Sequence, residues 1–283
     1  MMKVSFQWAK SIKMKKKLLV CRSLCAAVLF LSACSSQEEA DLKKAQASVA
    51  EGHNKQALTY FDHVIKRNAT ESLCLEAARE GARVAFYELH DYQKSAEYQH
   101  YIVLHSGDQR ERVEAQKQIA QIYFNNLQNY QQAILEFSKL QEMPHSDLEE
   151  AQYQMDLARA DYYLNNLFQA QSEIESLLKL KSDENVRFGA LMLKGNILVA
   201  EKKFGLAADI FRDLIEKYPE KSTQENVALT LAVCYEENND FKSAIKVLEQ
   251  YRGKYNPPEY IELRIKKLQE RMRNAPGAKG FHK

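Results

Sequence analysis

The stretch LMLKGNILVAEKKFGLAADIFRDLIEKYP, residues 191–219, contains the pattern that indicates the fold class. Its apolar residues recur at i, i+3, i+4, i+7 and i+8, on one face of a helix: Ala207, Ile210, Phe211, Leu214 and Ile215. Gly195 lies twelve residues before Ala207, and two such small residues let two helices approach closely. Pro219 ends the second helix because proline cannot continue it. The stretch therefore predicts a pair of packed helices.

The same pattern recurs along the chain with a period of 37 residues. Alanine occupies five positions at that spacing, and a sixth lies 39 residues upstream: Ala57, Ala96, Ala133, Ala170, Ala207 and Ala244. A bulky residue follows each alanine by four positions: Phe61, His100, Phe137, Ile174, Phe211 and Leu248. A small residue precedes four of the alanines by twelve positions: Ala45, Ala158, Gly195 and Ala232. In the second and third units the small residues, Ala82 and Ala120, lie earlier, which predicts a longer turn between the helices.

This periodicity predicts six helix pairs within residues 41–256. Their expected limits are about 41–74, 75–111, 113–147, 151–184, 188–221 and 225–256. Pro257 and Pro258 break the chain before a last helix within 257–273, whose apolar stripe we expect to cover the exposed end of the array. Residues 274–283 are expected to form a disordered tail.

The small residue of the first helix, the Ala-x₃-Phe of the second and the closing proline resemble the tetratricopeptide signature. This resemblance implies an all-α fold, a right-handed superhelical solenoid of about six helix pairs with a C-terminal capping helix. Such solenoids bind proteins or peptides on a concave surface, which the first helix of each pair lines. The period of 37 residues exceeds the usual ~34, which predicts slightly longer helices or links.

Residues 1–33 are typical of a bacterial lipoprotein signal peptide. This segment contains seven Lys and Arg residues and no acidic residue, and an apolar stretch over 24–33 follows its basic part. That stretch is shorter than the roughly 20 residues that span a bilayer, and it has the length of a signal-peptide core. Leu31-Ser32-Ala33-Cys34 resembles a lipobox, in which the cysteine is lipidated. We therefore expect Cys34 to anchor the chain and residues 34–40 to form a tether, with an ordinary secretory signal as the alternative.

The charge balance changes once residues 1–33 are removed. Lys and Arg fall from 40 to 33 against 38 Asp and Glu, so the remaining chain has a net charge of −5. The basicity belongs to the signal, and no nucleic-acid partner is indicated. Cys74 and Cys234 are expected to be small core residues rather than a disulfide.

The sequence contains no metalloprotease, phosphate-loop, CxxC or nucleophile-elbow motif. His90, His100 and His105 lie in one unit, but their spacing fits no common zinc pattern, so we interpret them as structural or solvated. The carboxylates are scattered over helix surfaces, without the apolar surroundings that general acid catalysis requires. We predict a protein that is not an enzyme and that takes no cofactor or metal.

Counting from the small first-helix residues predicts which side chains line the concave groove: Arg79, Arg83, Lys117, Gln121, Arg159, Tyr162, Tyr163 and Asn196. Such a groove is basic and partly aromatic, which suits a peptide carboxylate; simple solvation of a charged surface is the alternative. The C-terminal region 252–283 has nine Lys and Arg against three acidic residues. It is a candidate contact for peptidoglycan, anionic lipid or an acidic partner, and a solvated capping helix is the alternative.

The lipobox, the helix pairs and the segment FRDLIEKYP, residues 211–219, together resemble a group of envelope lipoproteins that includes BamD and CpoB. Ser35, which follows the cysteine, is similar to the signal for the outer membrane, facing the periplasm. The resemblance implies a membrane-anchored scaffold in outer-membrane protein assembly. A pilotin or secretion accessory lipoprotein of a type IV pilus or secretin is one alternative, because BamD-like chains have about five units rather than six. A CpoB-like coordinator of cell-wall synthesis and envelope constriction is the other.

Overall fold

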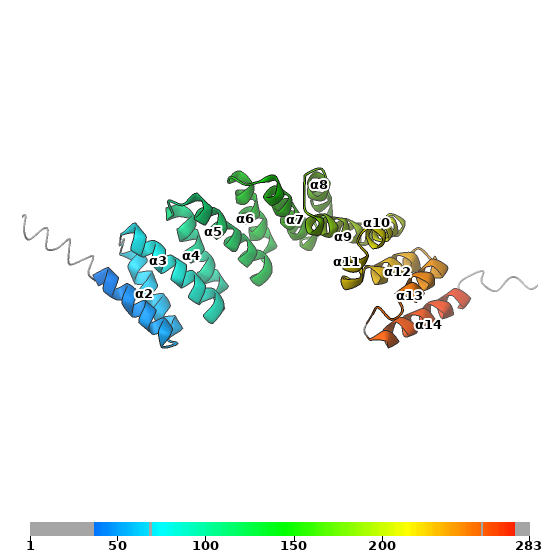
Figure 1. Cartoon of the computed structure of the whole chain (residues 1–283), viewed down its shortest axis with the longest axis horizontal. Coiled ribbons are helices and arrows are strands. Elements are labelled where there is room, and N and C mark those ends of the chain that lie inside the picture. Colours follow the sequence, from blue (N-terminus) through cyan, green and yellow to red (C-terminus); the bar gives the residue numbers. More distant parts are fainter. Residues whose placement is uncertain (1–36, 68–69, 256, 275–283) are drawn as a thin grey trace, which may run out of the picture. The chain divides into compact units, whose positions relative to one another are not determined.

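A computed structural model describes residues 37–67, 70–255 and 257–274, and every regular element among them is helical (Figure 1). The chain divides between Gln128 and Asn129 into two compact units. The signal segment 1–33, Cys34 and most of the expected tail lie outside the described residues. Residues 37–40 already belong to a helix that runs to residue 50, so the prediction of a tether through residue 40 is wrong for these four positions.

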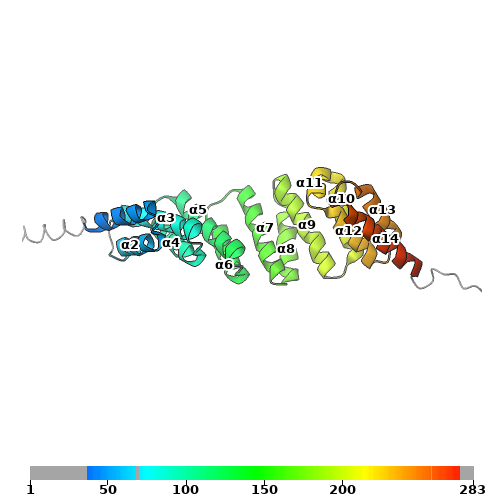
Figure 2. The same ribbon diagram turned by 90° about the horizontal axis from the view of Figure 1, so that it is seen from below.

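The first unit contains two complete helix pairs and the first helix of a third (Figure 2). After the helix over residues 37–50 come α2 (Asn54–Lys66), α3 (Glu71–Arg83), α4 (Tyr92–His105) and α5 (Gln109–Gln121). A π-helical turn extends α3 and another extends α5, at η1 (Val84–Glu88) and η2 (Ile122–Asn126). Within this unit α2 packs against α3, α3 against α4 and α4 against α5, so neighbours in sequence are neighbours in space.

The second unit contains the remaining described helices. It contains α6 (Tyr130–Glu142), α7 (Asp147–Tyr163), α8 (Leu167–Leu177), α9 (Glu184–Ala200), α10 (Phe204–Lys217), α11 (Pro219–Gln224), α12 (Val227–Glu237), α13 (Phe241–Tyr251) and α14 (Pro258–Asn274). Over the described residues the order gives six helix pairs, with α11 as a one-turn helix before the last pair, and the predicted all-α repeat fold is confirmed. The helix expected to cap the array is α14. Its Ile261, Ile265 and Leu268 pack in one core cluster with Leu248 of α13.

The repeated alanines lie in equivalent environments. All six, at 57, 96, 133, 170, 207 and 244, are completely buried, each in the second helix of its pair. The bulky residue four positions later is also buried in five pairs, but in the second pair the buried ring belongs to Tyr98 and His100 is partly exposed. Tyr98 packs where Gly81 leaves space, because a Cβ on Gly81 would lie 2.8 Å from the Tyr98 ring.

The longer turns expected in the second and third units are wrong. The link between the two helices of a pair has three residues in every case, including 89–91 and 127–129. The additional residues enter the first helix instead, as the π-turns η1 and η2, and the N–H groups of Leu89 and Leu127 just after them bond five residues back. Because a π-turn rotates everything beyond it relative to an α-helix, this change alters which side chains face a given neighbour.

The middle residue of each three-residue link has a positive φ. These residues are Gly52, His90, Gln128, Asn165, Lys202 and Asn239, with φ between 50° and 77°. The left-handed residue turns the chain back so that the N–H three positions beyond the helix reaches a carbonyl of its last turn, as from Asn166 to Asp161 at 2.8 Å. Asp or Asn then caps the next helix in several pairs, as Asp240 does by accepting from the Ser243 N–H.

Cys74 and Cys234 are both buried thiols, which confirms the prediction of small core residues. Burial raises the pKa of the Cys234 thiol to about 11, so this sulfur stays protonated and unreactive at neutral pH.

Candidate functional site

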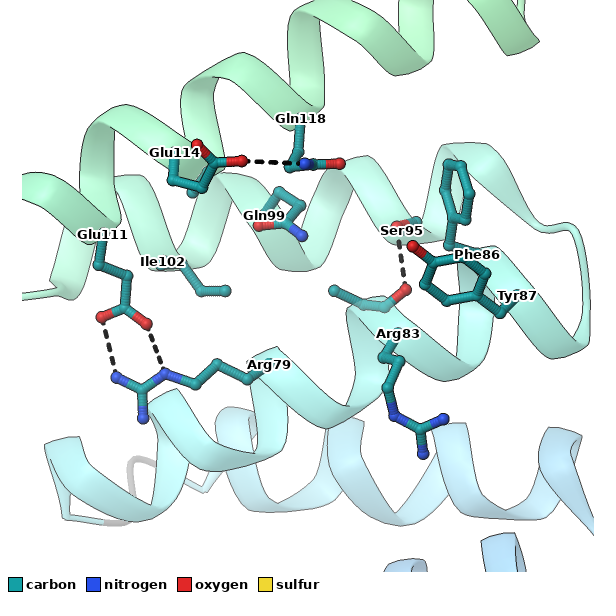
Figure 3. A pocket seen from close by; sticks show the side chains of 12 residues that line it. Arg79, Arg83, Phe86, Tyr87, Ser95, Gln99, Ile102, Glu111, Glu114 and Gln118 are labelled. Carbon is teal, nitrogen blue, oxygen red and sulfur yellow. Dashed lines mark hydrogen bonds and ion pairs between the residues drawn. The ribbon is translucent and has the colours of Figure 1, made fainter.

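A pocket of about 280 Å³ lies in the first unit, among α3, η1, α4 and α5 (Figure 3). Its lining comes from α3 (Arg79, Ala82, Arg83), η1 (Phe86, Tyr87), α4 (Ser95, Gln99, Ile102) and α5 (Glu111, Glu114, Ala115, Gln118). Two of the eight residues predicted for the groove, Arg79 and Arg83, are among them. The pocket is therefore lined by α3 and α5, the first helices of the second and third pairs, and by α4, the second helix of the second pair.

The helical period explains this lining. Arg79, Arg83 and Phe86 are spaced by four and three residues, so they follow one face of α3 into η1. Glu111, Glu114 and Gln118 share one face of α5 in the same way. Small Ala82 and Ala115 leave the space that these longer side chains surround. The Ser95 hydroxyl donates to the Ala82 carbonyl at 3.0 Å and joins α4 to α3.

Arg79 forms a two-bond ion pair across the pocket. Its Nε lies 2.5 Å from Glu111 Oε1 and its Nη2 lies 2.9 Å from Oε2. The Ser106 hydroxyl donates to the same carboxylate at 2.5 Å. These hydrogen bonds, that from Arg79 first, lower the pKa of Glu111 to about 2, and Glu111 in turn raises the pKa of Arg79. Arg79 is thus committed to holding α3 against α5.

Arg83 is held more loosely than Arg79. Its nitrogens lie 3.6 Å from Glu80 and 3.9 Å from Glu88, beyond hydrogen-bond distance, and its side chain is 48% exposed. Exposed pairs of this kind contribute little to stability, so Arg83 can exchange them for a carboxylate of a ligand. Tyr87, 67% exposed, lies one turn further along.

The predicted basic character is wrong for this pocket. Two arginines, Arg79 and Arg83, are balanced by Glu111 and Glu114 in the lining. Lys117 and Gln121 of α5 were predicted for the groove, whereas Glu114 and Gln118 of the same helix line this pocket. Lys117 is partly buried and Gln121 is exposed, and neither lines the pocket. Phe86, Gln99 and Gln118 also line the pocket and were not predicted. Phe86 could have been found from the sequence, because it lies three residues after Arg83 and therefore on the same helix face.

The other predicted residues lie in the second unit. Arg159 is partly exposed and lies 3.8 Å from Asp156, whose pKa burial raises. Tyr163 stacks on Tyr130 with ring centroids 4.8 Å apart, and Tyr162 packs against the core beneath α7. Asn196 is partly buried on α9.

Two of the three histidines singled out in the sequence have separate local contacts. His90 is the left-handed residue of its turn and contacts the Phe86 carbonyl, while His105 stacks on Tyr101 at 4.1 Å. Across the described ranges, no group of three or more His, Cys, Asp or Glu side chains has the arrangement of a metal site. None of the helices that the structure describes is long and apolar enough to cross a bilayer.

Comparisons with known proteins agree with the repeat architecture. Two family models described as tetratricopeptide repeat match residues 155–222 and 198–264. No curated protein matches the chain. The crystal structure of a tetratricopeptide repeat protein from Parabacteroides merdae is similar, with a TM-score of 0.52 at 13% identity over 86% of this chain and 88% of that one. That of yeast Tom70 has a TM-score of 0.51 at 16% identity over 78% of this chain and 45% of that one. Residues 155–264 therefore contain tetratricopeptide repeats, and the similarity to these solved structures shows the same all-α repeat fold for the chain.

Proposed function

We propose that this chain is a lipid-anchored scaffold of the bacterial envelope that binds a protein partner through the pocket among α3, α4 and α5. Tetratricopeptide repeats are protein-binding scaffolds, and both family matches are to such repeats rather than to an enzyme. The lipobox at Leu31–Cys34 supports the anchor, and Ser35 supports the outer membrane, facing the periplasm.

The single observation that carries the binding proposal is the availability of Arg83 beside Tyr87 at a pocket of about 280 Å³. That volume accepts one or two side chains of an extended peptide rather than a drug-sized ligand, which occupies about 300–1,000 Å³. The Gln99 and Gln118 amides offer donors and acceptors for a peptide backbone. Arg83 supplies the charge for a partner carboxylate, and Phe86 supplies an apolar wall.

Variants of exposed arginines test the site. Arg83→Glu replaces attraction of a carboxylate by repulsion, and we expect recovery of the partner from cross-linked membranes to fall by roughly fivefold, the equivalent of about 1 kcal/mol. Arg110→Glu is the matched control, because Arg110 is exposed on the same helix as Glu111 but does not line the pocket. Equal recovery with both variants would remove the pocket from the proposal. Arg159→Glu tests the α7 surface in the same assay.

For the process that the scaffold serves, we propose outer-membrane protein assembly, supported by the resemblance of residues 211–219 and of the lipobox to the BamD group. The prediction is co-purification with a β-barrel insertase, and depletion should lower the levels of outer-membrane barrels. Normal barrel levels, with no insertase recovered, would contradict it.

The six helix pairs favour a second candidate, a pilotin or secretion accessory lipoprotein, because BamD-like chains have about five units rather than six. Deletion would then leave barrel levels unchanged while a pilus or secretin ring fails to assemble. A CpoB-like role would instead place the protein at the division septum. In every case Cys34→Ala should release the protein from the membrane fraction, and retention there would contradict the lipid anchor.

A further inference from the structure

A second pocket, of about 370 Å³, lies in the second unit among α10, α11, α12 and α13. We propose that it binds an acidic peptide segment of a partner protein and takes one leucine-sized apolar side chain of that segment. Its sides come from α10 and α13, the second helices of the last two pairs, and from α11, and its floor comes from α12; it shares no residue with the Arg83 pocket. This proposal is independent of the function proposed above.

The pocket owes its shape to α11, an addition to the repeat that the sequence pattern did not reveal. Pro219 starts this one-turn helix, and the buried Ser222 hydroxyl donates to the Leu214 carbonyl of α10 at 2.9 Å. At the other side, the Tyr251 hydroxyl donates to the Thr223 carbonyl at 2.7 Å. These bonds hold α11 between the ends of α10 and α13, so the pocket has a fixed wall.

The interior of the pocket is apolar. Leu231 and Ala228 of α12 form a buried floor, and Ile215 of α10 and Val247 of α13 are only partly covered by neighbouring side chains. A leucine-sized side chain placed there would remove these surfaces from water, which is the main source of affinity at such sites.

The charged residues around this interior are all cations. Arg212, Lys246 and Lys254 line the pocket and are exposed, and no acidic side chain of the described chain lines it. Arg212 bonds to Asp209 at 2.7 Å, whereas the two lysine side chains form no ion pair with any described residue. A ligand that carries carboxylates on both sides of an apolar residue therefore complements the pocket in charge and in shape.

The occupant is a partner rather than the tail of this chain. Residues 275–283 contain Lys279 and Lys283 and no acidic residue, so the lysines of the pocket repel them. An acidic segment from another protein is attracted by the same field, and its attraction weakens as salt is added.

The test uses the full chain and a fluorescein-labelled heptapeptide that has leucine at its centre and acidic residues on both sides. Anisotropy should show binding that weakens when the leucine becomes alanine and when the acidic residues become lysine. The double variant Lys246→Glu with Lys254→Glu should bind about tenfold or more weakly, the loss of roughly 0.7 kcal/mol or more per lysine. Lys242→Glu with Lys267→Glu is the matched control, since both residues are exposed and lie outside the pocket.

A photoreactive leucine in the same peptide locates the site. Cross-links should fall on residues of α10–α13, and Gln250→Trp, which fills the pocket from an exposed position, should abolish them. Absence of binding to the unaltered chain, equal binding by the double variant and its control, or cross-links on α3–α5 would overturn the proposal. The Arg83→Glu variant should bind the peptide normally, so failure here and failure of the proposed function are distinguishable.

Discussion

Replacing Gly195 by alanine adds one methyl group where α9 packs against the Phe211 ring of α10. An ideal Cβ at this position would lie 2.6 Å from both Cε1 and Cζ of the Phe211 ring, more than 1 Å inside an ordinary carbon–carbon contact of about 3.7 Å. The ring cannot move aside freely, because Phe211 is completely buried. Either the ring rotates away from its rotamer or the two helices separate.

Two effects of opposite sign set the magnitude. Alanine favours the helix over glycine by about 1 kcal/mol. Overpacking of a filled core typically costs about 1–3 kcal/mol, and this contact, at 2.6 Å to two ring atoms, belongs at the upper end. We expect Gly195→Ala to lower the free energy of unfolding by about 1–2 kcal/mol.

Urea denaturation followed by circular dichroism measures this change, and the chain provides its own control. A Cβ on Gly205 of α10 would meet nothing within 4 Å, so Gly205→Ala retains the helical benefit without the clash and should be neutral or stabilising. Phe211→Leu, combined with Gly195→Ala, should cost less than the sum of the two single changes, because the smaller side chain makes room for the methyl group. If Gly195→Ala stabilises the protein as Gly205→Ala does, the inferred packing of α9 on α10 is wrong.

Three further predictions concern a turn, an ion pair and the last helix. Lys202→Gly should raise the free energy of unfolding by about 1 kcal/mol, because Lys202 has a φ of 60° that glycine adopts without strain; a lower denaturation midpoint would contradict this. Arg79→Gln should raise the pKa of Glu111 from about 2 toward 4.5 in a carboxyl NMR titration; this pKa is depressed in the folded chain, so the pair stabilises it above pH 4.5 and that contribution disappears as the pH falls toward 2. Glu236→Gln should speed hydrogen exchange in α14, because the buried Glu236 carboxylate accepts from Arg264 and Arg271 of that helix; unchanged exchange would show that apolar packing alone holds it.

The repeat could be predicted from the sequence because its signal lies in the smallest residues. Ala207 and Ala244 are completely buried, and a small residue recurs at this position in every repeat although the residues around it differ from one repeat to the next. The core thiols Cys74 and Cys234 were predicted correctly for a similar reason, since small apolar residues at helix interiors are normally buried.

The π-turns could be predicted only in part. The spacing from Ala82 to Ala96 is 14 residues instead of 12, which shows that residues are added but not whether the turn or the helix contains them. The structure places them in the helix. On α5, which precedes η2, Glu114 lines the pocket and Lys117 does not, so two glutamates accompany the two arginines there.

Two other features depend on contacts between residues that are distant in the sequence. Glu236 meets Arg264 and Arg271, which are 28 and 35 residues later, and no local pattern marks such a partnership. The pocket beside α11 depends on Tyr251 reaching back to Thr223, again 28 residues away.

Lys202 adopts a left-handed conformation that its residue type disfavours, because the closure of the helix pair requires it.

The claim that a protein partner occupies the pocket among α3, α4 and α5 is tested most directly by cross-linking in intact cells. A photoreactive phenylalanine analogue at position 87 replaces an exposed aromatic residue at the mouth of that pocket, and the same analogue at the exposed Phe168 serves as the matched control. We predict a cross-linked species at position 87 that is absent at position 168 and is lost in the Arg83→Glu background. Identical cross-linking patterns at the two positions would contradict it.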